Sequence, residues 1–153
     1  MTLSITVADP VCPEVGALIA AHLERSRALY PTTSEHSYDV ATLKANQVTL
    51  YVGRLKDIAV TIGGLRALSP RECEIKSMYT APFARGKGYG RAMVAHLMAE
   101  ARAGGHCRIL LETGSDPGSA AARRLYQAAG FAFCPRFGDY PDDALSVFMA
   151  AEL

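Results

Sequence analysis

Short stretches of alternating hydrophobic and polar residues mark several strands. Residues 3–8 alternate as a half-buried strand does. Residues 48–52 are rich in β-branched and aromatic side chains, which favour strands, and a turn at 54–57 makes residues 58–65 their hairpin partner. Residues 74–80 follow as another strand. The first half of the chain therefore predicts an early strand and, later, a run of three strands.

Longer segments show the spacing of amphipathic helices. Residues 13–30, 88–103 and 119–129 each place apolar side chains along one helical face. Glycines at 104–105 and at 130 follow the last two of these segments, and glycine is common just past the end of a helix. We therefore predict three main helices.

The remaining strands lie late in the chain. Residues 107–111, 131–133 and 145–150 are predicted as strands. Two adjacent glycines at 63–64 interrupt an earlier strand and indicate a bulge or a close approach of other groups. The mixture of strand meanders with strand–helix units predicts a mixed α/β fold, with residues 1–153 in a single domain.

Composition and charge exclude some classes of partner. The 153 residues carry 16 basic and 15 acidic side chains, for a net charge of +1. This balance gives no bulk attraction to nucleic acid or to a membrane surface. Half of the residues are hydrophobic and a fifth are charged, as in ordinary globular proteins.

The cysteines give no sign of a metal site. Cys12, Cys73, Cys107 and Cys134 are far apart in sequence, and no Cys/His spacing typical of zinc is present. No leader-like start and no apolar run of membrane-spanning length is visible. We therefore expect reduced thiols, no bound metal and a cytoplasmic location.

The sequence Arg-Gly-Lys-Gly-Tyr-Gly-Arg at residues 85–91 lies between a predicted strand and a predicted helix. Glycine permits positive φ and lets a ligand approach the backbone without a Cβ in the way. The helix N-terminus adds unpaired N–H groups and partial positive charge. The turn is therefore a candidate pyrophosphate site, and a plain tight turn is the alternative.

Two common phosphate-binding motifs do not match this turn. A P-loop requires Lys followed by Ser or Thr, and that pair is absent. A dinucleotide fingerprint requires Gly-x-Gly-x-x-Gly, whereas the glycines here alternate at 86, 88 and 90. A nucleotide-binding protein of either class is therefore disfavoured.

The turn resembles the acyl-coenzyme A site of the GNAT family of N-acetyltransferases. Residues 74–85 resemble that family's central strand and its approach to the turn. Residues 125–131, Leu-Tyr-Gln-Ala-Ala-Gly-Phe, resemble its second signature, where a helix ends against a strand. Residues 136–148 are similar to a bacterial subgroup with a Phe-Gly-Asp-Tyr stretch. Two motifs in the right order make the resemblance specific.

The resemblance implies a mixed sheet of about six or seven strands, about four helices and a splayed central strand pair that holds acetyl-CoA. It also implies that late edge strands form a homodimer. The residues that it implies for cofactor binding, from the strand, the turn and the later helix, are Met78, Tyr79, Thr80, Arg85, Gly86, Lys87, Gly88, Tyr89, Gly90, Arg91 and Ser119.

Acetyl transfer to an amine calls for a neutral amine, donors for the oxyanion and a proton donor for the leaving thiolate. The resemblance implies that Tyr126 is this acid; the alternative is a tyrosine that packs its helix against the sheet. Glu74 is a candidate base, or else it pairs with Lys76 or a neighbouring strand. Alternation along residues 74–79 places Glu74, Lys76 and Met78 on one face of the strand.

One position departs from the family pattern. Many members have an asparagine seven residues before the helix tyrosine, and Ser119 stands there in this chain. Thr113, Gly114 or Ser119 is a candidate to replace that asparagine's contact with the cofactor or the substrate.

The sequence gives the fewest indications about the site that binds the acceptor. Asp139 and Tyr140, in a polar loop, are candidates to bind a cationic amine; a surface turn is the alternative. His36 is a candidate for the opposite wall, or a solvated loop histidine.

The predicted function is transfer of an acetyl group from acetyl-CoA to a small-molecule amine or an amino acid, by direct attack in a ternary complex. Acetylation of a protein N-terminus or lysine, and non-catalytic binding of acyl-CoA, are the alternatives.

Overall fold

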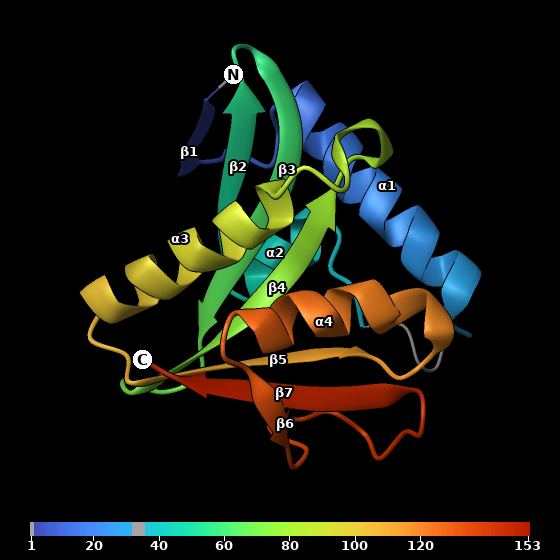
Figure 1. The fold of residues 1–153 in the computed structure, drawn as a ribbon, viewed down its shortest axis with the longest axis vertical. Helices are drawn as coiled ribbons and strands as arrows, with labels where there is room; N and C mark the ends of the chain where they lie inside the picture. The colour runs from blue at the N-terminus through green and yellow to red at the C-terminus, as the bar shows by residue number, and fades with distance from the viewer. Residues whose placement is uncertain (1, 32–35) are drawn as a thin grey trace.

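The computed structural model describes residues 2–31 and 36–153. Seven strands form one mixed sheet in the order β1-β2-β3-β4-β5-β7-β6 (Figure 1). The strands are β1 (Leu3–Val7), β2 (Thr49–Leu55), β3 (Ile58–Ala67), β4 (Glu72–Thr80), β5 (Arg108–Gly114), β6 (Ala132–Cys134) and β7 (Ser146–Glu152). The α-helices are α1 (Pro13–Leu29), α2 (Val40–Ala45), α3 (Tyr89–Ala103) and α4 (Ala120–Ala128). The predicted mixed α/β fold is confirmed.

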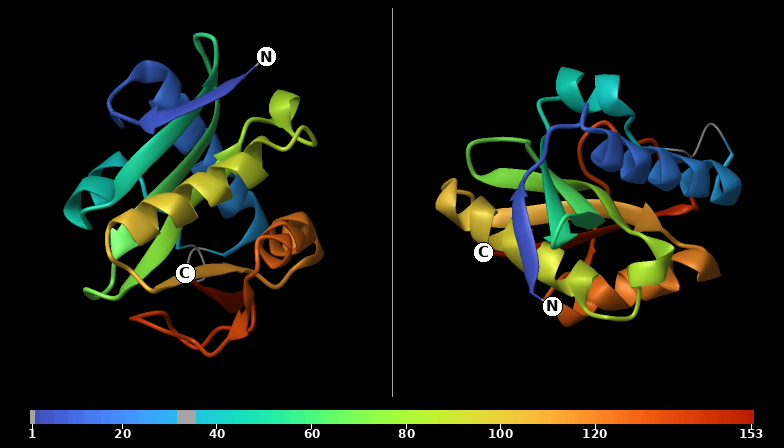
Figure 2. Two further views of the ribbon diagram at one scale, coloured as in Figure 1. Left: turned by 60° about the vertical axis from the view of Figure 1, so that its left-hand side comes forward. Right: turned by 90° about the horizontal axis from the view of Figure 1, so that it is seen from above.

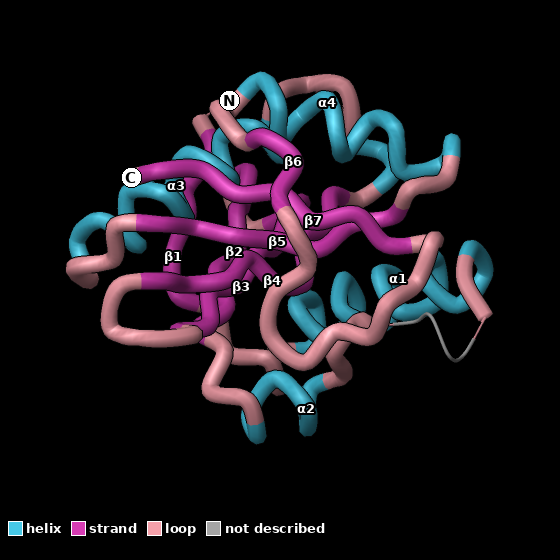
Figure 3. The backbone as a smooth tube through the Cα atoms, turned by 90° about the horizontal axis from the view of Figure 1, so that it is seen from below, coloured by secondary structure: helices cyan, strands magenta, loops and turns pink. Residues whose placement is uncertain are grey.

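Helices cover both faces of the sheet. α3 and α4 lie on one face, and α1 and α2 lie on the other (Figures 2 and 3). The core under α3 and α4 includes the fully buried Met93, Leu97 and Met149. The core under α1 and α2 includes Val15 and Leu43. None of the helices in the described ranges is long and apolar enough to cross a membrane.

A bulge interrupts the pairing of β3 with β4. Ile62 pairs with Tyr79 and Gly64 pairs with Lys76, so the register shifts between them. Ser77 has a φ of 57°, in the left-handed region. β4 contains one residue more than β3 across this interval, so the bulge lies in β4, opposite the two adjacent glycines and not in their own strand. The close approach predicted at these glycines is confirmed, because a Cβ on Gly63 would lie 2.7 Å from the sulfur of Met78.

The bulge corrects one sequence prediction. Strict alternation put Met78 on the face of Glu74 and Lys76, but Met78 packs into the core under α3 and α4, whereas Tyr79 joins the core under α1. The extra residue at Ser77 reverses the alternation from that point onward.

β4 and β5 diverge in the middle of the sheet. They pair in parallel only from Glu72↔Arg108 to Glu74↔Leu110, and the ribbons then separate (Figure 1). β5 continues to pair with β7 along its whole length. The facing edges of β4 and β5 beyond this point therefore have backbone groups without a strand partner between them. The splayed pair implied by the resemblance is present.

Candidate active site

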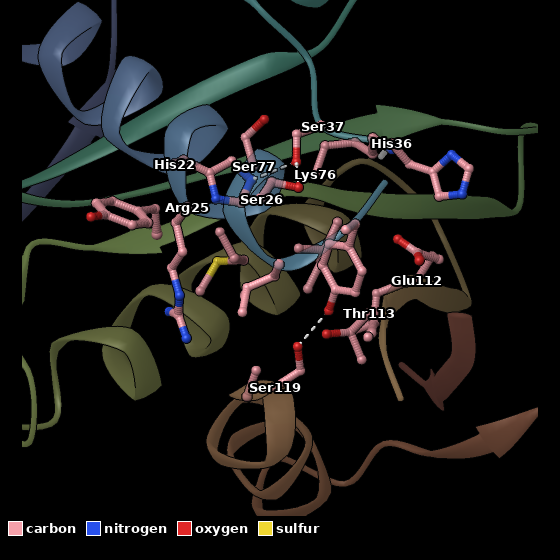
Figure 4. Close-up of a pocket in the computed structure, with 18 of the residues that line it drawn as sticks. His22, Arg25, Ser26, His36, Ser37, Lys76, Ser77, Glu112, Thr113 and Ser119 are labelled. Carbon is pink, nitrogen blue, oxygen red and sulfur yellow. Dashed lines mark hydrogen bonds between the residues drawn. The ribbon is translucent and has the colours of Figure 1, made fainter. Parts of the chain in front are cut away.

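A cavity of about 200 Å³ lies at the divergence of β4 and β5 (Figure 4). Its walls come from α1, the loop that precedes α2, β4, β5 and α4. The strand residues that line it are Ile75, Lys76, Ser77, Met78 and Tyr79 of β4 and Leu111, Glu112, Thr113 and Gly114 of β5. Both polar and apolar side chains face this space, as expected for a small-molecule site.

The glycine turn leads from β4 into α3. Gly86 and Gly88 have φ values of 75° and 87°, which glycine adopts without strain. A Cβ atom added to either would meet nothing within 4 Å, so the backbone is open to a ligand. Gly88 is the N-cap of α3 and no side chain caps the helix there. The turn thus has the form of an anion site, with exposed Arg85, Lys87 and Arg91 around it.

Tyr126 projects from α4 into the wall of the cavity. Its side chain is 6% exposed and packs edge-on against Phe131, with the ring centroids 5.8 Å apart. Burial, and then the negative charge of Glu112, raise the pKa of the Tyr126 hydroxyl far above its ordinary value. The phenol therefore keeps its proton at neutral pH and is a hydrogen-bond donor.

Glu112 lines the same cavity from β5, and sequence reasoning missed it. Its carboxylate accepts a hydrogen bond of 2.7 Å from Ser146 Oγ. Burial raises the pKa of Glu112, and the hydrogen bond from Ser146 opposes that rise. The predicted strand ended at residue 111, whereas β5 continues to Gly114. An acidic residue within a buried strand is typical of a functional site, and this feature could have identified Glu112.

Glu74, by contrast, sits in a closed polar cluster. Its side chain is 1% exposed and does not line the cavity. Tyr140 donates its hydroxyl hydrogen to Glu74 Oε2. Lys76 Nζ lies 3.7 Å from Glu74 and Arg66 Nη1 lies 3.6 Å from it, across from β3. These contacts are the cross-strand pairing that the sequence offered as the alternative to a base.

We expect Glu74→Ala to destabilise the protein strongly. Loss of the carboxylate leaves buried Lys76 without its counter-charge, which costs about 3–5 kcal/mol in comparable buried pairs. Glu72→Ala, on the same strand, is the control, because Glu72 forms only a half-exposed pair with Arg108 worth less than about 1 kcal/mol. Urea unfolding measures both free energies, and equal losses would contradict the role assigned to Glu74.

Comparisons with known proteins identify the family. The model of the acetyltransferase (GNAT) family matches residues 17–131. The chain belongs to the GNAT acetyltransferase family. Over 151 residues it is 33% identical to YsnE of Bacillus subtilis, an uncharacterised N-acetyltransferase, covering 99% of this chain and 100% of that protein. It is 36% identical to an IAA acetyltransferase of Azospirillum brasilense, covering 82% and 81% of the two chains.

A solved structure agrees with this assignment. A Klebsiella pneumoniae protein assigned as an acyl-CoA N-acyltransferase superposes with a TM-score of 0.82 and 29% identity, covering 99% of this chain and 98% of that one. The protein is thus a GNAT N-acetyltransferase, an enzyme of a family that uses acetyl-CoA as the acetyl donor.

The GNAT position usually held by asparagine lies at the cavity. Ser119 lines it together with Thr113 and Gly114. Ser119 Oγ lies 2.6 Å from the hydroxyl of Tyr30, which reaches over from the end of α1, and 2.9 Å from Asp116 Oδ1. All three residues named as replacements for the asparagine are therefore brought to the site.

Of the residues expected to bind the acceptor, the structure brings only some to the cavity. His36 lines the cavity, and its ring lies edge-on to Tyr140, with centroids 5.3 Å apart. Tyr140 is turned inward, where its hydroxyl also accepts a 2.7 Å hydrogen bond from Lys76. Asp139 is exposed and is not brought to the cavity. The aromatic packing of Tyr140 against Phe137 and Phe148 holds the loop in this position.

No thiol reaches the cavity of this GNAT enzyme. The four cysteines are free, and none of them is among the lining residues. Within residues 2–31 and 36–153, no group of three or more His, Cys, Asp or Glu side chains could hold a metal ion.

Proposed function

We propose that the enzyme transfers acetyl from acetyl-CoA to the primary amine of a small molecule, by direct attack within a ternary complex. The observation that carries this proposal is the cavity at the divergence of β4 and β5, which is lined both by a proton donor, Tyr126, and by a carboxylate that can act as a base, Glu112. The relative described as an IAA acetyltransferase favours a small-molecule acceptor over a protein.

In this proposal the cofactor follows the edge of β4. The backbone of Met78, Tyr79 and Thr80 binds the pantetheine arm, and the amides of residues 86–91 hold the pyrophosphate. The unpaired edge of β4 and the open space beside Gly86 and Gly88 support this path. Arg85 is fixed beside it, because its Nε donates a 2.9 Å hydrogen bond to the carbonyl of Thr80.

The chemistry proceeds by proton transfer and displacement. Glu112 takes a proton from the ammonium of the acceptor, directly or through water. The amine nitrogen then attacks the thioester carbon, and backbone amides near the β4 bulge stabilise the oxyanion. As the carbon–sulfur bond breaks, the Tyr126 hydroxyl donates to the thiolate of CoA. The nitrogen loses its second proton to solvent, and Glu112 passes the proton that it took to the Tyr126 phenolate, directly or through water. The amide and free CoA remain, with one net proton released.

Glu112→Gln should lower turnover about 100-fold, the usual contribution of a general base. The base acts only when deprotonated. Since burial raises the pKa of Glu112, wild-type activity should fall as pH drops through a value above the ordinary glutamate pKa of 4.5. This acidic limb should disappear from the pH–rate profile of Glu112→Gln. Glu100→Gln, on the exposed side of α3, should retain both rate and profile; an unchanged acidic limb in Glu112→Gln would remove Glu112 as the base.

Initial-rate kinetics with varied acetyl-CoA and amine test direct attack. The absence of cysteine from the described cavity lining favours a mechanism without an acetyl-enzyme. We expect intersecting double-reciprocal lines and no acetylated protein by mass spectrometry. Parallel lines with a covalent acetyl group on the enzyme would contradict the proposal.

The homodimer expected from the late edge strands stays a prediction. The edge strand β6 exposes Phe133, which is compatible with such a contact.

A further inference from the structure

Helix α1 changes character along its length. Its first turns bury apolar side chains, Val15, Leu18 and Ile19, against the sheet. Its last turns face the cavity with a helically spaced set that is mostly polar: His22, Arg25, Ser26, Leu29 and Tyr30. The early part of this helix face packs as core, whereas the part beside β4 and β5 is available to bind a ligand.

Arg25 is a charged residue of this face. Its Nη2 donates a 3.1 Å hydrogen bond to the carbonyl of Gly118, which ties this exposed side chain to the segment between β5 and α4. Figure 4 shows Arg25 pointing away from α1 among the residues that line the cavity. It forms no ion pair with any residue in the described part of the chain. A guanidinium has five N–H donors, so several remain for a ligand.

The other charges around the cavity are largely compensated. Lys76 is 8% exposed, donates to Tyr140 and lies 3.7 Å from the carboxylate of Glu74. Glu112 is the acidic residue of the described lining, and it belongs to β5, whereas Arg25 belongs to α1. Among the described residues, α1 thus offers a cation without an ion pair and β5 offers a carboxylate.

The end of α1 is also held close to β5 and to the loop that follows it. The hydroxyl of Tyr30 lies 2.6 Å from Ser119 Oγ and donates to Asp116, so the end of α1 is tied to the loop between β5 and α4. A Cβ on Gly114 would lie only 1.6 Å from that hydroxyl oxygen, which shows how closely it covers the strand. Together with the bond from Arg25 to Gly118, this bridge favours a small acceptor over a polypeptide.

We propose that the acceptor is a small amino acid-like molecule, whose carboxylate is bound by Arg25 while its amine faces Glu112. Arginine pairs with carboxylates in a bidentate geometry, which fixes the orientation of the ligand as well as its position. This inference rests on the proposed acetyl transfer and adds the chemical class of the acceptor.

The test compares amino acids with their carboxamides, and kcat/KM is expressed per neutral amine, because the amine of the amide has a lower pKa than that of the free acid. α-, β-, γ- and aromatic amino acids and their carboxamides are each supplied with acetyl-CoA, and release of the CoA thiol is followed. We expect kcat/KM to favour the free acid over its amide by about tenfold to 100-fold, the range for a charged hydrogen-bonded pair. Arg25→Gln should lower kcat/KM for the acid until the preference disappears, and Arg25→Lys should restore part of it.

Arg27→Gln is the matched control, because Arg27 is exposed on the same helix and does not line the cavity. It should keep the wild-type preference. Equal use of acids and amides by the wild type, or an undiminished preference in Arg25→Gln, would overturn the carboxylate assignment and leave acetyl transfer standing. Thiol release that no amine stimulates would instead overturn the proposed function, and the present inference with it.

Discussion

Replacement of Gly88 by valine should weaken CoA binding by at least about 100-fold, because two or more charge-assisted hydrogen bonds to phosphate would be lost. Gly88 has a φ of 87° at the first turn of α3, and no atom lies within 4 Å of the position of an added Cβ. The side chain would therefore fill the space in which a pyrophosphate approaches the backbone amides. Titration calorimetry with CoA measures the effect.

Gly105→Val is a close control for this variant. Gly105 follows the other end of α3, has a φ of 85° and also has open space around an added Cβ. Both variants carry the same backbone strain, on the order of 1–2 kcal/mol, but only Gly88 lies at the proposed pyrophosphate site. Equal weakening in the two variants would trace the loss to strain, and wild-type affinity in Gly88→Val would refute the site.

Tyr126→Phe should lower turnover by about 100-fold with little change in CoA affinity, as expected for loss of a general acid. The ring would still pack against Phe131, so the fold and the cavity wall persist. Only the hydroxyl is removed. Single-turnover measurements isolate the chemical step, and calorimetry reports cofactor binding separately.

Tyr51→Phe separates a catalytic hydroxyl from a merely buried one. Tyr51 is 7% exposed and packs against His96 under α3, away from the cavity. Burial raises the pKa of Tyr51 as it does for Tyr126. Its loss should leave single-turnover rates unchanged. If Tyr126→Phe likewise keeps the wild-type rate when chemistry is limiting, Tyr126 is not the acid.

Much of the fold could be predicted because its signals are local. The helix before Gly104 and the helix that ends near Gly130 have both a periodic apolar face and a terminating glycine, and both form as predicted. The glycine turn at residues 85–91 could also be predicted from its local sequence. Family resemblance then supplied the splayed strands, which no local pattern of residues 72–80 or 108–114 specifies.

The sequence predictions fail where contacts between distant parts of the chain determine the structure. Alternation misplaced Met78, since a bulge depends on pairing with another strand. Glu112 was missed because the strand continued beyond its predicted end. Glu74 and Tyr140 lie 66 positions apart in sequence, so their hydrogen bond could not be predicted from spacing. Because of that contact the side chain of Tyr140 points inward, whereas Asp139 is exposed to solvent.

The central claim is that an amine in the cavity between β4 and β5 attacks acetyl-CoA. The most direct measurement is release of the CoA thiol with and without a panel of small amines, with the product identified by mass spectrometry. We predict release that rises with amine concentration and yields the acetylated amine in equal amount. Tight CoA binding without any amine-dependent release would contradict the claim.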